Sequence, residues 1–129
     1  MLNLNAIGLF VRDMAQTVAF YRDVMGMTTD WQGDANAELY CGEGKLILFS
    51  RADFETMTAR PYTYPSALNG TMELAFDLPS YADVDREYAR ITACGAQPVF
   101  APTTEPWGQR TCYVADPDGN LIELSSFQP

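Results

Sequence analysis

The sequence of 129 residues contains no histidine, and this absence removes several kinds of chemistry at once. Histidine is the commonest metal ligand and the usual general base near neutral pH, and a serine–histidine–aspartate triad cannot be built without it. Cysteine is scarce as well, because Cys41, Cys94 and Cys112 are far apart, odd in number and without metal-ligand spacing. Cysteines distributed in this way favour reduced thiols of a cytoplasmic protein.

Basic residues and long apolar runs are also in short supply. Eight lysines and arginines are scattered among 17 acidic residues, which gives a formal net charge of −9. Nucleic acids and anionic membrane surfaces both bind basic patches, so neither partner is expected. No apolar run approaches the roughly 20 residues of a membrane-spanning helix. The first residues lack the features of a signal peptide, which again predicts a cytoplasmic location.

What the sequence does contain is an internal repeat. Residues 6–11 and 73–78 both show the alternating apolar positions of a strand. A helix of about 12 residues is predicted after each strand, with Asp13 and Ser80 as the capping residues. A shift of 67 residues superimposes the first strand and helix on the second.

The strands that close the two repeats correspond as well. GKLILF, residues 44–49, superimposes on GNLIEL, residues 119–124, at a shift of 75. Each begins with the glycine of a turn formed by an acidic residue and a glycine, Glu43-Gly44 and Asp118-Gly119, and we expect these glycines to have positive φ. The pattern predicts a duplicated β-α-β-β-β module.

We therefore expect the α+β class, with an open, cupped mixed sheet and helices on its convex face. The chain, residues 1–129, is interpreted as a single domain of two modules. The first spans about 1–50 and the second about 70–129. The linker, about 51–69, is rich in proline and is predicted to include a helical turn near 52–58.

The two faces of the predicted sheet differ in character. One face is uniformly apolar and is expected to pack on the helices: Ile7, Leu9, Val11, Ile47, Phe49, Leu74, Phe76, Leu78, Ile122 and Leu124. The other face mixes small, aromatic and acidic residues: Ala6, Gly8, Phe10, Leu48, Glu73, Ala75, Asp77 and Glu123. A concave, partly hydrated surface suits the second set better than a core does.

FYRDVMGM at the end of the first helix and DPDGNLIEL near the C-terminus, set in a duplicated module, resemble the vicinal oxygen chelate superfamily. This superfamily includes glyoxalase I, extradiol dioxygenases, methylmalonyl-CoA epimerase and the fosfomycin- and bleomycin-resistance proteins. The resemblance covers nearly the whole chain. It implies a homodimer, because single-domain members usually form the cup by pairing modules across chains.

The resemblance also implies four metal-ligand positions, which are Ala6, Leu48, Glu73 and Glu123 here. Only Glu123 is a usual ligand at its position, Glu73 stands where histidine is common, and Ala6 and Leu48 cannot ligate. An iron dioxygenase needs two histidines and a carboxylate, so that activity is excluded. We expect no cofactor; the alternative is a hard divalent ion held by Glu73, Glu123 and water.

Three functions remain open. The bleomycin-resistance proteins lack a metal and bind a cationic drug in crevices between two subunits. Their resemblance implies that this chain binds a small cationic or aromatic molecule in its cup. The second possibility is a lyase or isomerase of the glyoxalase type, with Glu73 and Glu123 as acid and base, with or without a divalent metal. The third is a non-catalytic structural or regulatory dimer.

The side chains predicted to contact a ligand are aromatic, apolar or cationic: Phe10, Trp31, Leu48, Trp107, Arg110 and Tyr113. Each has a simpler alternative. The tryptophans can serve in packing, Arg110 in a salt bridge, and Glu73 and Glu123 as solvated strand residues. Cys112 is interpreted as a structural thiol, because nothing nearby in the sequence lowers its pKa.

Overall fold

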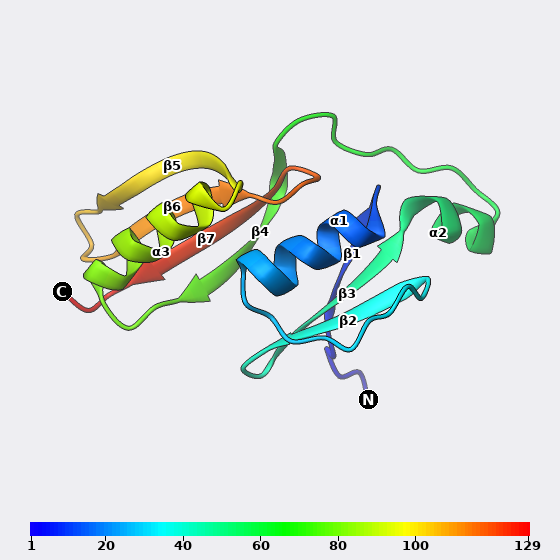
Figure 1. Cartoon of the computed structure of the whole chain (residues 1–129), viewed down its shortest axis with the longest axis horizontal. Helices are drawn as coiled ribbons and strands as arrows, with labels where there is room; N and C mark the ends of the chain where they lie inside the picture. The colour runs from blue at the N-terminus through cyan, green and yellow to red at the C-terminus, as the bar shows by residue number, and fades with distance from the viewer. The chain divides into compact units, whose positions relative to one another are not determined.

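The computed structural model describes residues 1–129, and the chain divides into two units, Met1–Tyr64 and Pro65–Pro129. The units contain sheets of three and four strands of mixed direction, together with helices (Figure 1). The predicted α+β class is therefore confirmed. None of the helices combines the length and the hydropathy that a membrane span requires.

The first unit contains β1 (Ile7–Val11), α1 (Met14–Ala19), a π-helical turn η1 (Phe20–Val24), β2 (Asn36–Cys41), β3 (Gly44–Ser50) and α2 (Arg51–Thr58). Asp13 caps α1 as predicted, because its side chain accepts a hydrogen bond of 3.0 Å from the backbone N–H of Gln16. The helical turn predicted in the linker is present as α2. Its capping residue is Ser50, whose hydroxyl accepts from the backbone N–H of Asp53.

The sheet of the first unit has the order β1-β3-β2, with β1 parallel and β2 antiparallel to β3. The duplicated pattern predicts a fourth strand in this module. The structure has in its place an isolated bridge between Thr28 and Tyr40 of β2. The first module is thus a three-stranded version of the predicted unit.

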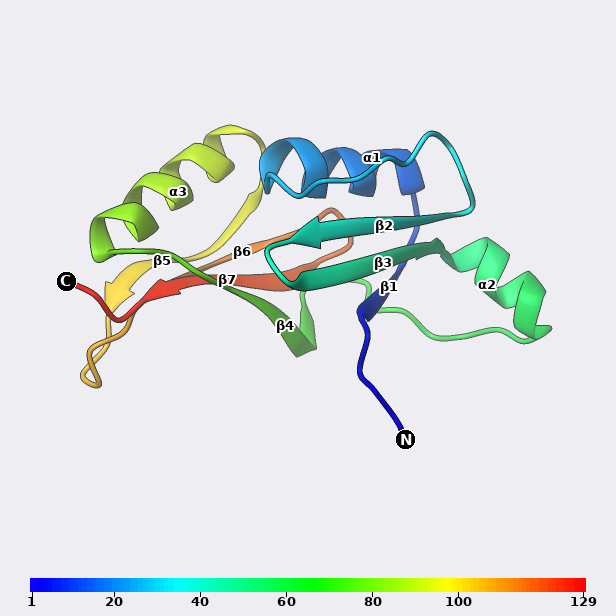
Figure 2. The same ribbon diagram turned by 90° about the horizontal axis from the view of Figure 1, so that it is seen from below.

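The second unit contains β4 (Asn69–Asp77), α3 (Tyr81–Ala93), β5 (Gln97–Thr104), β6 (Arg110–Ala115) and β7 (Asn120–Ser126). Its sheet has the order β4-β7-β6-β5, and α3 lies over one face of it (Figure 2). The side chains buried on this face come from α3, β6 and β7: Val84, Ile91, Cys112, Val114 and Ile122. Ser80 caps α3 as predicted, accepting from the backbone N–H of Asp83.

The packed face of the first sheet differs from the prediction by one residue in β3. Leu9 and Leu48 pair across β1 and β3, and both are buried, with 5% and 0% exposure. Ile47 pairs with Gly8 and lies on the opposite face. A slip of one residue moves every side chain of a strand to the other face. The predicted ligand-binding role of Leu48 is therefore wrong, because Leu48 belongs to the core.

The one-residue error in the predicted correspondence of β3 and β7 begins at the turns that precede these strands. β3 starts at Gly44, whereas β7 starts at Asn120, one residue beyond Gly119, so the strands correspond at a shift of 76 rather than 75. The turn before β3 has its positive φ of 55° at Gly42 and not at Gly44. Gly119 has φ 88°, as predicted. The residue of the first unit that corresponds to Glu123 is therefore Ile47.

This register predicts unequal effects of two neighbouring substitutions in β3. Leu48→Ala should lower the free energy of unfolding by about 2–5 kcal/mol, because it leaves a cavity in the core. Ile47→Ala should cost clearly less, since Ile47 is only half-buried on the other face. Urea unfolding of both variants measures the difference. An equal or larger loss for Ile47→Ala would contradict the register.

Candidate functional site

The candidate site lies on the face of the second sheet that α3 does not cover. Successive residues of a strand point to opposite faces, so Cys112 and Ile122 pack toward α3 while Thr111, Tyr113 and Glu123 point away from it. Tyr113 and Glu123 are directly paired across β6 and β7. The antiparallel pairing thus gathers hydroxyl groups around the carboxylate of Glu123.

Glu123 is a buried carboxylate, with 9% exposure, whose hydrogen bonds all converge on one oxygen. Its Oε2 accepts from Thr111 Oγ1 at 2.7 Å, from Tyr113 Oη at 3.2 Å and from Gln109 Nε2 at 3.4 Å. These donors are neutral, and none of the ion pairs in the structure includes Glu123. The carboxylate is therefore held in place without being neutralised, and Oε1 remains available to accept a further hydrogen bond.

Tyr113 links Glu123 to the second predicted carboxylate, Glu73. Burial raises the pKa of the Tyr113 phenol above its usual value, and a hydrogen bond to Glu73 and the charges of Glu123 and Glu73 raise it further. A phenol has one proton, so it donates to one carboxylate at a time. Glu73 lies on the same face as Glu123, because Ala75, two residues after Glu73, pairs with Glu123. Glu73 itself is exposed.

A cavity of about 510 Å³ opens on this face of the second unit. Its apolar and aromatic lining comprises Val99, Phe100, Trp107, Tyr113 and Leu121, and its polar lining comprises Glu105, Gln109, Thr111 and Glu123. The volume falls in the range of small-molecule sites, which are mostly apolar with a few polar groups. The lining carries two carboxylates and neither lysine nor arginine, so its charge is negative.

One side of the cavity is formed by the β5–β6 hairpin, residues 104–110. Its turn is closed by hydrogen bonds from Glu105 N to Gln109 O, 2.8 Å, and from Gly108 N to Glu105 O, 2.9 Å. Gly108 has φ 91°, a conformation that favours glycine. The hydroxyl of Tyr81 on α3 donates to the carbonyl of Gly108, which attaches the hairpin to the helix.

Among the predicted ligand contacts, the structure brings together only Trp107 and Tyr113 with Glu123. Arg110 points to the other face, where its Nη2 lies 2.8 Å from Asp85 Oδ1 on α3. The salt bridge considered for Arg110 is thus the one that forms. Gln109 and Thr111 were not predicted. Thr111 could have been found from Tyr113, because a residue two positions earlier on β6 shares its face of the strand. Gln109 precedes β6, so its contact with Glu123 depends on the geometry of the hairpin turn.

Phe10 and Trp31 belong to the first unit. Phe10 is partly exposed, and its ring stacks on Phe54 of α2 at 4.0 Å between centroids. The indole N–H of Trp31 donates to the backbone carbonyl of Asp34 at 2.8 Å. Neither lines the cavity of the second unit.

Comparison with known proteins identifies the family. The sequence model of the Glyoxalase/Bleomycin resistance protein/Dioxygenase superfamily matches residues 3–124, so the chain belongs to this superfamily. It is 32% identical over 127 residues to the YraH protein of Bacillus subtilis, which covers 95% of this chain and 97% of that protein. A bleomycin resistance protein of Geobacillus stearothermophilus is 28% identical over 124 residues, with 88% and 89% covered. A family enzyme from Burkholderia phytofirmans has a TM-score of 0.84 at 21% identity, with 98% and 99% covered.

The residues present do not fit the four-ligand metal site of this family. No group of three or more histidine, cysteine, aspartate or glutamate side chains is placed to hold a metal ion. Oε2 of Glu123 is occupied by neutral donors, and Ile47, the corresponding residue of the first unit, cannot ligate. That the protein carries no metal remains a prediction.

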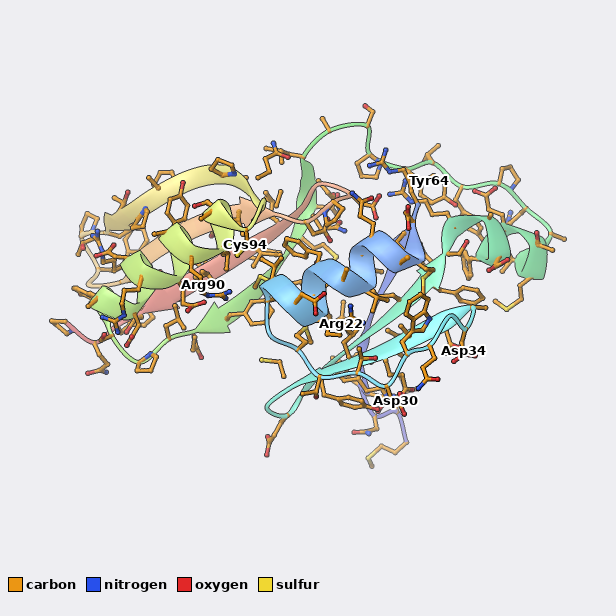
Figure 3. The ribbon with its side chains drawn as sticks, in the orientation of Figure 1. Arg22, Asp30, Asp34, Tyr64, Arg90 and Cys94 are labelled. Carbon is orange, nitrogen blue, oxygen red and sulfur yellow. The ribbon has the colours of Figure 1, made fainter.

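The accessibility of the three cysteines tests the burial of Cys112 beneath α3. Cys41 and Cys94 are exposed, the latter at the C-terminal end of α3 (Figure 3), whereas Cys112 is buried and burial raises its pKa to about 11. We predict that dithiobis(nitrobenzoate) at pH 8 labels two thiols in the native protein and the third only in urea.

The raised pKa of Cys112 also makes the stability of the folded state depend on pH. The folded state keeps this thiol neutral, so the stability it contributes is complete below pH 9 and is lost between pH 9 and about 11. Unfolding curves of the wild type and Cys112→Ala at pH 8 and pH 10.5 measure this. Labelling of three thiols at pH 8, or the same pH dependence in both proteins, would contradict the placement of Cys112.

Proposed function

We propose that the protein binds a small organic cation with a planar or aromatic part in the cavity of the second unit. One observation carries this proposal. Glu123 is a nearly buried carboxylate whose charge is stabilised by neutral donors and is not paired with a cation.

The physical reason is electrostatic. An ionised group removed from water is costly unless it is hydrogen-bonded and paired. Here the hydrogen bonds are supplied by the protein, and a cationic N–H group of a ligand would supply the opposite charge at Oε1. Glu105, which also lines the cavity, adds a second negative charge. An anionic ligand would be repelled by Glu105 and Glu123, and the lining has no lysine or arginine to attract it.

The aromatic lining explains the second part of the proposal. Phe100, Trp107 and Tyr113 offer ring faces or edges to a ligand, and cations and planar groups both interact favourably with such rings. The 28% identity to a bleomycin resistance protein of Geobacillus stearothermophilus supports the binding of a small molecule, and the resemblance to proteins of that kind implies a cationic one. We propose further that the protein binds its ligand without a metal and as a homodimer, as that resemblance implies.

A second candidate is a lyase or isomerase that uses Glu73 and Glu123 as acid and base. The position of Tyr113 between the two carboxylates favours it, because the phenol could pass a proton from one to the other. Glu73, however, does not line the cavity that contains Glu123. Simple binding therefore requires fewer assumptions than catalysis by Glu73 and Glu123 together. A non-catalytic structural or regulatory dimer, the third possibility, would need no ligand at all.

The binding proposal predicts a charge-selective site. Benzamidinium should bind the wild-type protein, whereas benzamide, its neutral analogue, should not bind measurably. Glu123→Gln preserves an oxygen for the three donors but removes the charge, and it should weaken benzamidinium binding by roughly tenfold to a hundredfold. Isothermal titration calorimetry measures the affinities, and light scattering of the same samples tests for two chains per particle.

Glu87→Gln is the matched control for this experiment. Glu87 lies on α3 and pairs with Arg90 on the opposite side of the sheet from the cavity. The Glu87→Gln variant should bind benzamidinium with the affinity of the wild type. Equal binding by Glu123→Gln and the wild type would refute the proposed role of Glu123.

The absence of a metal is tested separately. We predict substoichiometric zinc, nickel, manganese and iron in the purified protein by elemental analysis. Dialysis against EDTA should change neither the melting temperature nor the affinity for benzamidinium. A stoichiometric metal that disappears in Glu123→Gln would instead support the metal-dependent alternative.

A further inference from the structure

Gln109 connects the exposed tryptophan of the cavity to its buried carboxylate. Trp107 Nε1 donates to Gln109 Oε1 at 2.9 Å, and Gln109 Nε2 lies 3.4 Å from Glu123 Oε2. An indole nitrogen can only donate and an ionised carboxylate can only accept, so the amide of Gln109 has a single orientation that satisfies both. The hydrogen bonds therefore run in one direction, from the indole to the carboxylate.

Trp107 has little else to fix its position. It lies in the turn of the β5–β6 hairpin, and the residue is 65% exposed. A tryptophan in such a turn ordinarily samples several rotamers, which a ligand would have to restrict on binding. The hydrogen bond to Gln109 holds the indole beside the cavity before any ligand arrives.

We propose that Gln109 is a specificity-determining residue that positions Trp107 as a stacking surface for the aromatic part of the ligand. This inference rests on the proposed function, because it concerns the same cavity. It assigns two tasks to two residues. Glu123 selects the charge of the ligand, and Gln109 selects a planar ligand by acting through Trp107.

The division of tasks predicts which affinities change. Gln109→Met keeps the length of the side chain but removes both hydrogen bonds. This substitution should lower the affinity for benzamidinium, which has a ring to stack on Trp107, by roughly threefold to tenfold. Acetamidinium has the same cationic group without a ring, and its affinity should change less than twofold. A residue with a merely structural role would lower both affinities together.

The sequence contains two tryptophans. The experiment uses the full chain with Trp31→Phe, so that Trp107 is the only tryptophan left. Calorimetry gives the two affinities for this protein, Gln109→Met, Trp107→Leu and the double variant. Gln109→Met should have no further effect on benzamidinium once Trp107 is leucine, because the two residues act through one contact. Gln97→Met is the control, since Gln97 is exposed on β5 and does not line the cavity.

The fluorescence anisotropy decay of Trp107 reports its mobility without any ligand. Gln109→Met should increase the fast local motion of the indole, and Gln97→Met should not. An unchanged ratio of the two amidinium affinities, additive effects in the double variant, or an equally rigid indole would each overturn the role of Gln109 alone. Failure of the wild type to bind either amidinium would overturn the proposed function, and with it the ligand selection assigned to Gln109.

Discussion

The site depends on the hydrogen bonds that Thr111 and Tyr113 donate to Oε2 of Glu123, at 2.7 Å and 3.2 Å. The contact from Gln109, at 3.4 Å, is the longest and weakest of the three. A carboxylate this deeply buried would destabilise the sheet without partners, and a protein cation as partner would neutralise it. Neutral donors satisfy the carboxylate and preserve its charge. They also leave its other oxygen available, as the proposed binding of a cation requires.

The alternation of β6 and β7 makes this arrangement compatible with a stable fold. One set of side chains, with Cys112 and Ile122, packs beneath α3, and Arg110 forms its ion pair with Asp85 on the same side. The other set is free to carry polar and aromatic groups. In the first unit β3 is the strand equivalent to β7. Its residue at the position of Glu123 is Ile47, which carries no charge. The two copies of the module therefore differ in chemistry while sharing the order of three strands.

Local patterns in the sequence were sufficient for much of the fold. The caps at Asp13 and Ser80 and the position of Glu123 away from the helix follow from short-range periodicity. The register of β3 did not, because LILF is apolar at every position and cannot show which face is buried. The partners of Glu123 depend on pairing between strands. That Arg110 meets Asp85, 25 residues earlier, depends on how α3 packs on the sheet.

The most direct test of the central claim is a crystal structure of the protein with benzamidinium. We predict that an amidinium nitrogen lies within hydrogen-bonding distance of Glu123 Oε1, with Thr111 and Tyr113 still bound to Oε2 and the ring against Trp107. Benzamidinium bound elsewhere on the chain, with Oε1 of Glu123 not engaged, would contradict the claim that this buried carboxylate is a cation-binding group.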